Sequence, residues 1–283
     1  MEFLKINKGA ENEVKIHYQD CGKGRPVLLI HGWPLSHEMW EYQVEDLINA
    51  GNRVITYDRR GFGQSSKPYA NYTYDILAED LKALMDYLDL QDVTLVGFSM
   101  GGGEVVRYFT NYGGARVSKV VLVSSIIPYM LQTHDNPEGV NGSVFDTMFG
   151  KLKEDRIGFL ETFGKQFFGI NLVNKPVSTP LMEYYRMLGS IASPKATQEC
   201  MKAFVNTDFR NEARSINVPT LIIHGTEDKT VPIEASSDRA AKLIKGSRYI
   251  TYDGAPHGLF YTDREKLNKD LIAFIKEPAL VLS

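Results

Sequence analysis

The pentapeptide Gly97-Phe98-Ser99-Met100-Gly101 has the residue types and spacing of a serine nucleophile held on a sharp turn. An apolar run ends immediately before it, and a helix-like pattern begins immediately after it. The two glycines allow a strand to reverse tightly into a helix, with the serine strained and uncrowded. No Gly-Lys-Ser/Thr is present for a phosphate loop, and no G-x-G-x-x-G occurs at this turn for a dinucleotide. We interpret Ser99 as a nucleophile; the alternative is a glycine-rich turn with an incidental serine.

A serine hydroxyl needs a base to take its proton, and His257 is the best-placed histidine. It stands in the loop 254–258 (GAPHG), after the last expected strand and before the last expected helix. Loops at the carboxyl ends of parallel strands form the sites of open α/β folds. The other histidines have structural interpretations: His224 packed within a strand, His17 on an edge strand, His31 in a loop considered below, and His37 and His134 on surface turns.

The acid that orients this base should lie between the serine and the histidine in chain order, after another strand. The loop after the expected strand 220–224 supplies Glu227 and Asp228, and we favour Asp228. Asp253 is too close to His257 in sequence to reach it comfortably, and is interpreted as a turn residue. The sequence therefore predicts a Ser–Asp–His triad with Asp228 as its acid.

A tetrahedral oxyanion needs fixed N–H donors, and the amide of Met100, directly after the nucleophile, is one candidate. The second is expected in the loop His31-Gly32-Trp33-Pro34, which follows an early strand. We assign it to the amide of Trp33, since Gly32 permits a tight turn and Pro34 has no N–H. The alternative is a loop that merely holds a packed tryptophan.

The turn-rich stretch 58–66 (DRRGFGQSS) carries two arginines and two glycines. A phosphate site is one interpretation, but arginine–carboxylate pairing within a structural turn is favoured. The chain has no H-E-x-x-H, no cysteine pair at metal spacing and no EF-hand loop. We therefore expect no metal.

The elements that must position these residues alternate between strand and helix patterns, which favours an α/β class with a mostly parallel, doubly wound sheet. Short apolar runs of this kind are typical of strands buried on both faces. The expected strands are 14–18 (an edge strand), 26–30, 54–57, 92–96, 119–123, 220–224 and 248–252, and the expected helices are about 73–89, one after Ser99 to about 112, and 264–276.

Residues 126–215 break this alternation and are predicted to form an inserted helical cap on a core of 1–125 and 216–283. Within the insertion, Phe159, Phe163 and Phe167 recur every four residues, as expected for one face of a helix. Ordinary packing onto the sheet is the favoured interpretation of this stripe. The alternative is that cap aromatics such as Phe145, Phe159 and Phe163 line a ligand pocket.

Composition excludes several classes of protein. Hydrophobic residues make up 43% and charged residues 24% of 283, as in ordinary globular proteins, and the formal net charge of −3 gives no footprint for nucleic acid or an anionic membrane. No apolar run has the length of a membrane helix, and the start has no secretory apolar core. Two cysteines, Cys21 and Cys200, suit free thiols in a reducing, cytoplasmic location.

Taken together, these motifs resemble the α/β-hydrolase superfamily, and more closely its cofactor-free haloperoxidase, perhydrolase and aryl esterase branch, over almost the whole chain. The strings that carry the resemblance are 31–36 (HGWPLS), 57–63 (YDRRGFG), 97–104 (GFSMGGGE), 207–210 (TDFR) and 254–258 (GAPHG). The resemblance implies a Ser99–Asp228–His257 triad, an oxyanion hole from the amides of Trp33 and Met100, and a helical cap. It also implies that no haem, vanadium or flavin is needed.

The activity implied is acyl transfer on small esters or carboxylic acids. Water as acceptor gives hydrolysis, whereas hydrogen peroxide gives a peracid that oxidises bromide or chloride away from the protein. Related enzymes often associate, which makes a homo-oligomer an expectation. We hypothesise that Pro34 shifts the oxyanion loop toward the acyl pocket and favours peroxide over water; the alternative is a rigid start to the loop.

Two other functions remain open from the sequence. An amidase or lactamase would use the same triad, and a ligand-binding protein would retain the fold without catalysis. Epoxide hydrolases and haloalkane dehalogenases of this fold are excluded, because they need an aspartate at the position of Ser99.

Overall fold

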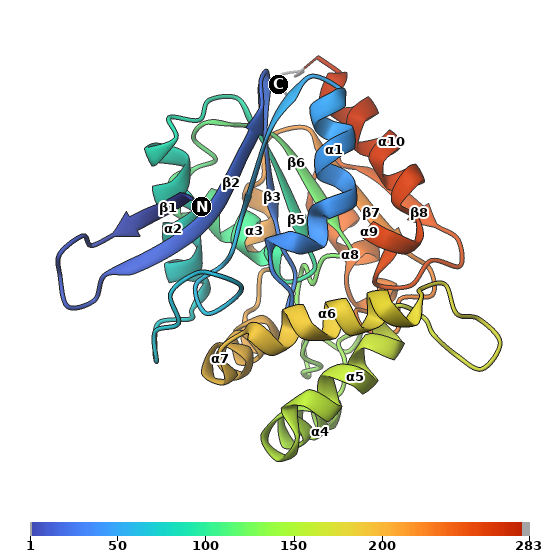
Figure 1. Ribbon diagram of the computed structural model, residues 1–283. Coiled ribbons are helices and arrows are strands. Elements are labelled where there is room, and N and C mark those ends of the chain that lie inside the picture. The colour runs from blue at the N-terminus through green and yellow to red at the C-terminus, as the bar shows by residue number, and fades with distance from the viewer. Residues whose placement is uncertain (1, 279–283) are drawn as a thin grey trace.

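The computed structural model describes residues 2–278 and is built on one eight-stranded sheet (Figure 1). The strands lie in the order β1-β2-β4-β3-β5-β6-β7-β8. β1 and β2 pair antiparallel, as do β2 and β4, and the other neighbours are parallel. The strands are β1 (Glu2–Ile6), β2 (Val14–Gly22), β3 (Arg25–Ile30), β4 (Asn52–Tyr57), β5 (Val93–Phe98), β6 (Val117–Val123), β7 (Thr220–Gly225) and β8 (Arg248–Tyr252).

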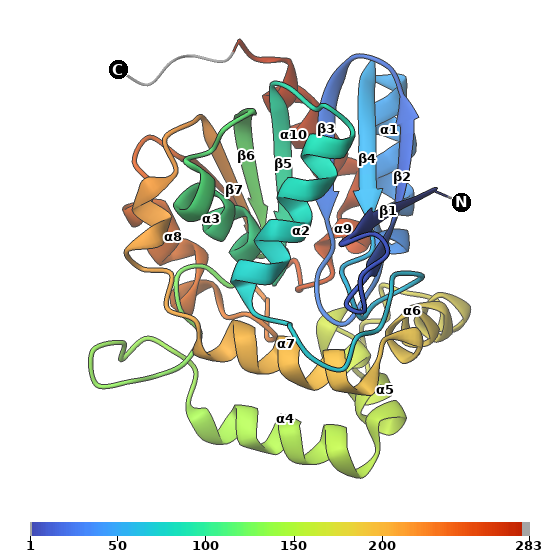
Figure 2. The ribbon, with the colours of Figure 1, turned by 90° about the vertical axis from the view of Figure 1, so that its left-hand side faces the viewer.

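Helices cover both faces of this sheet, which confirms the doubly wound α/β class. Alternate residues of each parallel strand enter two separate apolar cores, as the two-residue period of a strand requires. One core packs against α2 (Tyr74–Tyr87), α3 (Gly101–Tyr112) and α8 (Ser237–Leu243). The other packs against α1 (Glu41–Asn49), α9 (Leu259–Thr262) and α10 (Arg264–Lys276) (Figures 1 and 2).

The sequence interpretation was wrong at the edge of the sheet. The segment 14–18 was expected to be an edge strand, but it begins β2, which pairs with β4 on one side and β1 on the other. β1 escapes a pattern-based prediction because its outer residues are exposed and only Leu4 is fully buried. His17, expected on an edge, is consequently buried in the second strand.

Between β6 and β7 the chain leaves the sheet and forms four helices below the carboxyl ends of the strands (Figure 2). These cap helices are α4 (Gly142–Glu154), α5 (Arg156–Phe167), α6 (Thr179–Ile191) and α7 (Pro194–Asn206). Each helix is preceded by a capping residue whose side chain accepts a hydrogen bond from a backbone N–H of the first turn. The capping residues of α4, α5, α6 and α7 are Asn141, Asp155, Ser178 and Ser193 respectively. These caps fix where each helix starts over the site.

Short 3-10 helices at His37–Trp40, Glu212–Ser215 and Ile233–Ala235 complete the described elements. None of the helices within residues 2–278 combines the length and apolarity needed to cross a lipid bilayer.

Candidate active site

The turn between β5 and α3 places Ser99 at the carboxyl edge of the sheet. Ser99 has a φ of +52°, a left-handed conformation that costs energy for a residue with a side chain. Its N–H donates to Val123 O at 2.9 Å, and its carbonyl accepts from the N–H of Gly102 at 3.1 Å. A Cβ on Gly101 would lie 2.7 Å from Ile30 O, so a glycine is required here for the helix to start beside β3. The local structure is therefore a strained turn that holds the serine at the carboxyl edge of the sheet.

Three side chains from different loops meet at this turn. His257 Nε2 lies 3.0 Å from Ser99 Oγ, and His257 Nδ1 lies 2.6 Å from Asp228 Oδ2. All three residues are buried. The distances fit a hydroxyl that gives its proton to an imidazole whose other nitrogen is held by a carboxylate. The structure thus brings together the serine, histidine and aspartate predicted from sequence.

Asp228 is held by more than His257. Its Oδ1 accepts the backbone N–H groups of Thr230 at 2.9 Å and Val231 at 2.8 Å. His224 Nε2 lies 3.1 Å from its Oδ2. Burial opposes ionisation of Asp228, but the two histidines and their hydrogen bonds outweigh it and hold its pKa well below the ordinary value. The carboxylate is therefore charged and fixed in orientation.

The contact of His224 with Asp228 was missed from sequence, where His224 was interpreted only as a packed strand residue. It is buried in β7, and its Nδ1 lies 2.7 Å from Ser237 Oγ. The available signal was its spacing, since His224 precedes Asp228 by four residues across a single tight loop.

The two predicted oxyanion donors flank the nucleophile. Within residues 2–278, neither the N–H of Trp33 nor that of Met100 donates a hydrogen bond, so both remain available to an oxyanion. A Cβ on Gly32 would lie 2.5 Å from the ring of Phe98, which shows how closely the Trp33 loop approaches the nucleophile turn. The loop is thus placed to deliver a second N–H.

Buried polar groups fix this loop from behind. His31 Nδ1 lies 2.9 Å from Gly32 O, and His31 Nε2 accepts the N–H of Arg59 at 3.0 Å. Burial and the charge of Arg59 hold the pKa of His31 well below its usual range, so the ring is neutral. The Arg59 guanidinium donates to His31 O at 2.7 Å and pairs with Glu104 of α3, which also accepts from the Tyr57 hydroxyl at 2.6 Å.

The stretch 58–66 is a structural turn, as favoured from sequence. Its two arginines are both paired: Arg59 with Glu104, and Arg60 with Asp80 at 2.6 Å. These two carboxylates lie on α2 and α3, so the turn joins both helices to the end of β4. The arginines hold the fold together at this edge and are not exposed to a phosphate.

His37 was predicted on a surface turn, and this prediction was wrong. His37 is buried, and its N–H and Nδ1 lie 2.9 and 2.7 Å from Asp58 Oδ1. His17 Nδ1 lies 3.3 Å from Asp58 Oδ2. Among residues 2–278 these three form the one group whose ligand atoms are close enough to hold a metal. Because the Asp58 carboxylate already accepts hydrogen bonds from His37 and from the N–H of Gln64 at 2.8 Å, we interpret this group as a hydrogen-bonded cluster.

A cavity opens above Ser99 between the sheet and the cap helices. Its open space, counted out to the mouth, is about 390 Å³. The walls are mostly apolar and come from both sides: Trp33, Ser99, Ile126, Met130, Phe145, Met148, Phe163, Phe204, Thr230, Val231 and His257. This chemistry suits a small, largely uncharged acyl compound.

The four predicted pocket residues lie in three different places. Phe145 and Phe163 line the cavity at Ser99. Phe159 lies behind them, with its ring centroid 5.5 Å from Phe163 and 6.3 Å from Trp33. Pro34 lines a neighbouring cavity between α5 and α6, which shares Phe163 with the first. The spacing that placed these aromatics on one helix face did not indicate which ring reaches the nucleophile.

Residues 25–264 match the model of a protein family described as having the alpha/beta hydrolase fold. The chain is 39% identical to a non-heme haloperoxidase of Rhodococcus erythropolis, over 98% of this chain and 100% of that protein. It is 38% identical to a bifunctional esterase/perhydrolase of Acinetobacter calcoaceticus, over 93% of this chain and 96% of that one. Among solved structures, the bromoperoxidase from Bacillus anthracis is 45% identical with a TM-score of 0.94, over 98% of this chain and 99% of that one.

Proposed function

The chain belongs to the α/β-hydrolase family, and on that premise we propose that it is a serine-dependent acyltransferase for small esters and carboxylic acids, which uses water or hydrogen peroxide as acyl acceptor. The observation that carries this proposal is the continuous chain from Ser99 Oγ through His257 to Asp228, with contacts of 3.0 and 2.6 Å. The relatives named above, two haloperoxidases and an esterase/perhydrolase, support the choice of acceptors.

In the first step, Ser99 Oγ attacks the acyl carbon while His257 Nε2 takes its proton. The charge that develops on the carbonyl oxygen is stabilised by the N–H groups of Met100 and Trp33. His257 then gives its proton to the leaving alcohol or water, and the acyl group remains on Ser99. Asp228 holds Nδ1–H and stabilises the transient imidazolium.

In the second step, an acceptor attacks the acyl-enzyme while His257 takes the acceptor's proton. Water yields the carboxylic acid, and hydrogen peroxide yields the peracid, with Ser99 restored in both cases. The peracid oxidises bromide or chloride in solution to the hypohalous acid and is itself reduced to the carboxylic acid. Protein groups and these reactants suffice for every step, so we propose no cofactor and no halide site.

A fluorophosphonate probe tests the nucleophile directly. We expect covalent labelling at Ser99, located by mass spectrometry of peptides, and loss of labelling in the His257→Ala variant. Circular dichroism must show that this variant is folded. A folded wild-type protein that resists the probe would favour the ligand-binding alternative.

The choice of acceptor is tested on a panel of esters, amides and lactams, each with and without peroxide and bromide. We expect esters to react, and bromide to be oxidised only when both ester or acid and peroxide are present. A preference for lactams or amides would replace the proposal with the amidase alternative.

The role of Pro34 is tested on the same panel with a Pro34→Leu variant. Because Pro34 directly follows the Trp33 amide, a larger and more flexible residue there is expected to lower the ratio of peracid formation to hydrolysis. An unchanged ratio contradicts the hypothesis and leaves Pro34 as a rigid start to the loop.

A further inference from the structure

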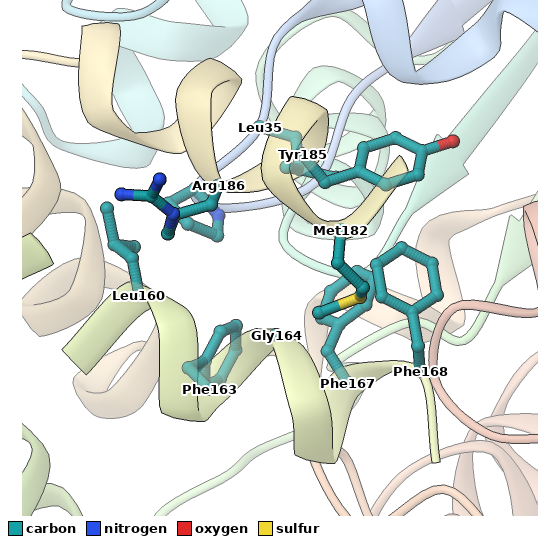
Figure 3. A pocket seen from close by; sticks show the side chains of 10 residues that line it. Leu35, Leu160, Phe163, Gly164, Phe167, Phe168, Met182, Tyr185 and Arg186 are labelled. Atoms are coloured by element: carbon teal, nitrogen blue, oxygen red, sulfur yellow. The ribbon is translucent and has the colours of Figure 1, made fainter. Parts of the chain in front are cut away.

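A second cavity lies beside the active site, between α5 and α6 (Figure 3). Its volume is about 360 Å³ including the mouth. Leu160, Phe163 and Phe167 of α5 form one wall, and Met182 and Arg186 of α6 form the other, as the close-up shows. The walls are apolar apart from the side chain of Arg186, which lies at the edge next to Leu160.

This cavity adjoins the catalytic centre. Phe163 lines both the second cavity and the cavity above Ser99. Phe167, also in its wall, lies edge-on to the imidazole of His257, with 4.7 Å between the ring centroids. The two spaces therefore meet at the Phe163 side chain, and a change of its rotamer is the movement that would join them.

Arg186 is the unusual feature of this cavity. Among residues 2–278, no carboxylate lies within ion-pair distance of its guanidinium, and it makes no hydrogen bond. Other charges stand nearby in the outer groove that it shares with Met182: Glu161, which pairs with Lys165 at 2.8 Å, together with Lys175 and Glu183. A half-buried guanidinium with five donors and no acceptor favours binding of an anion, above all a carboxylate.

We propose that this cavity is a second substrate subsite, which holds the methylene chain of an acyl group and pairs a carboxylate at its far end with Arg186. The substrate class is then the half-esters of dicarboxylic acids. The apolar walls suit the chain, the Phe163 junction leads to Ser99, and the arginine suits the distal charge. This inference rests on the proposed acyl transfer and narrows its substrates.

The test compares monomethyl esters of four- to eight-carbon dicarboxylic acids with methyl esters of the corresponding monocarboxylic acids. We expect one chain length at which the half-ester has the higher kcat/KM. At that length Arg186→Gln should lower kcat/KM at least tenfold, mainly through KM, because charge-assisted hydrogen bonds to carboxylates are strong. The uncharged ester should change by less than about twofold, and Arg186→Lys should recover part of the loss.

Lys175→Gln is the matched control, since it removes one positive charge from the outer groove without touching the second cavity. It should affect the charged and uncharged esters alike. Equal effects of Arg186→Gln on both ester types, or no preference for any half-ester, would overturn the proposal while leaving acyl transfer intact.

A binding measurement separates this proposal from the proposed function. Calorimetry of the preferred half-ester with the Ser99→Ala variant should give a dissociation constant that rises about tenfold when Arg186→Gln is added. Arg186-dependent binding without hydrolysis of any ester by the wild type would support the subsite and refute acyl transfer. Binding that ignores Arg186 would refute the subsite.

Discussion

The candidate active site has two walls of contrasting chemistry. On the sheet side, polar groups are held by hydrogen bonds: Asp228 by two N–H groups and two histidines, and the Trp33 loop by His31 and Arg59. On the cap side, rings such as Phe145 and Phe163 meet the substrate space through apolar contact. Hydrogen bonds fix orientation, whereas apolar contacts fix shape and adapt to it. We therefore expect the sheet wall to set the rate and the cap wall to set selectivity.

The largest effect expected on the sheet wall is that of Asp228→Asn. An amide in this position favours the wrong tautomer of His257, so kcat for ester hydrolysis should fall by about 10³ to 10⁴. Steady-state kinetics on one ester measure this, with KM nearly unchanged. His224→Gln, which keeps a donor near Asp228, is the control and should cost about tenfold or less. A loss of kcat/KM that comes mainly from a higher KM would contradict the expectation that Asp228 sets the rate.

The next effect concerns stability. Arg59→Met leaves the carboxylate of Glu104 buried without its cation, which should lower the free energy of unfolding by about 3–5 kcal/mol. Denaturation with urea measures this. Adding Glu104→Gln removes the unpaired charge and should recover part of the loss. If Arg59→Met alone is as stable as the wild type, the Arg59–Glu104 pair does not stabilise the sheet wall.

A smaller effect is expected on the cap wall. Phe145→Leu keeps an apolar side chain but changes the shape of the cavity above Ser99. KM for a short ester should rise by roughly threefold while kcat stays within about twofold, and stability should change by less than about 1.5 kcal/mol. Kinetics over a series of acyl lengths test this. A fall in kcat of tenfold or more would contradict the expectation that the cap wall sets selectivity and not the rate.

The smallest effect is a pH dependence behind the sheet wall. Burial alone would lower the pKa of His37, but its hydrogen bond to Asp58 and the charge of Asp58 raise it. The extra stability is complete below the unfolded pKa of about 6.5 and disappears as pH rises through the higher folded pKa. The Tm advantage of the wild type over His37→Asn, which keeps an N–H donor, should therefore shrink between about pH 5 and pH 8. A difference in Tm between the two proteins that widens as pH rises would contradict this expectation.

The fold and the meeting of the triad side chains followed from local patterns. The apolar runs of β3 and β5 identify doubly buried strands, and the strand–glycine–serine–glycine–helix order predicts the turn at Ser99 from local sequence alone. The carboxyl ends of neighbouring parallel strands share one edge, so loops as far apart as those of Asp228 and His257 converge. The family comparison confirms this fold, and the catalytic roles are tested by the experiments above.

The remaining features depend on tertiary contacts that no local pattern carries. Glu104 of α3 is the partner of Arg59, which follows β4, and buried His37 contacts Asp58, which is also distant in sequence. The cap aromatics share one helical period, yet the orientation of α5 alone decides that Phe163 reaches the cavity and Phe159 stays behind it. Helix orientation is set by packing of the whole insertion and is not encoded in spacing.

Trp33 contacts both walls, and its position has a consequence for the intrinsic fluorescence of the protein. Its indole N–H donates to Thr197 O of α7 at 2.9 Å, and its ring contacts Phe163 and Phe204 at the substrate space. The chain has two tryptophans, and the other, Trp40, lies in the core next to Phe98. Of the two, Trp33 alone lines the cavity, so an acyl compound entering it changes the surroundings of one indole. Intrinsic fluorescence of the unlabelled protein therefore carries a signal of occupancy, with Trp40 as a constant background.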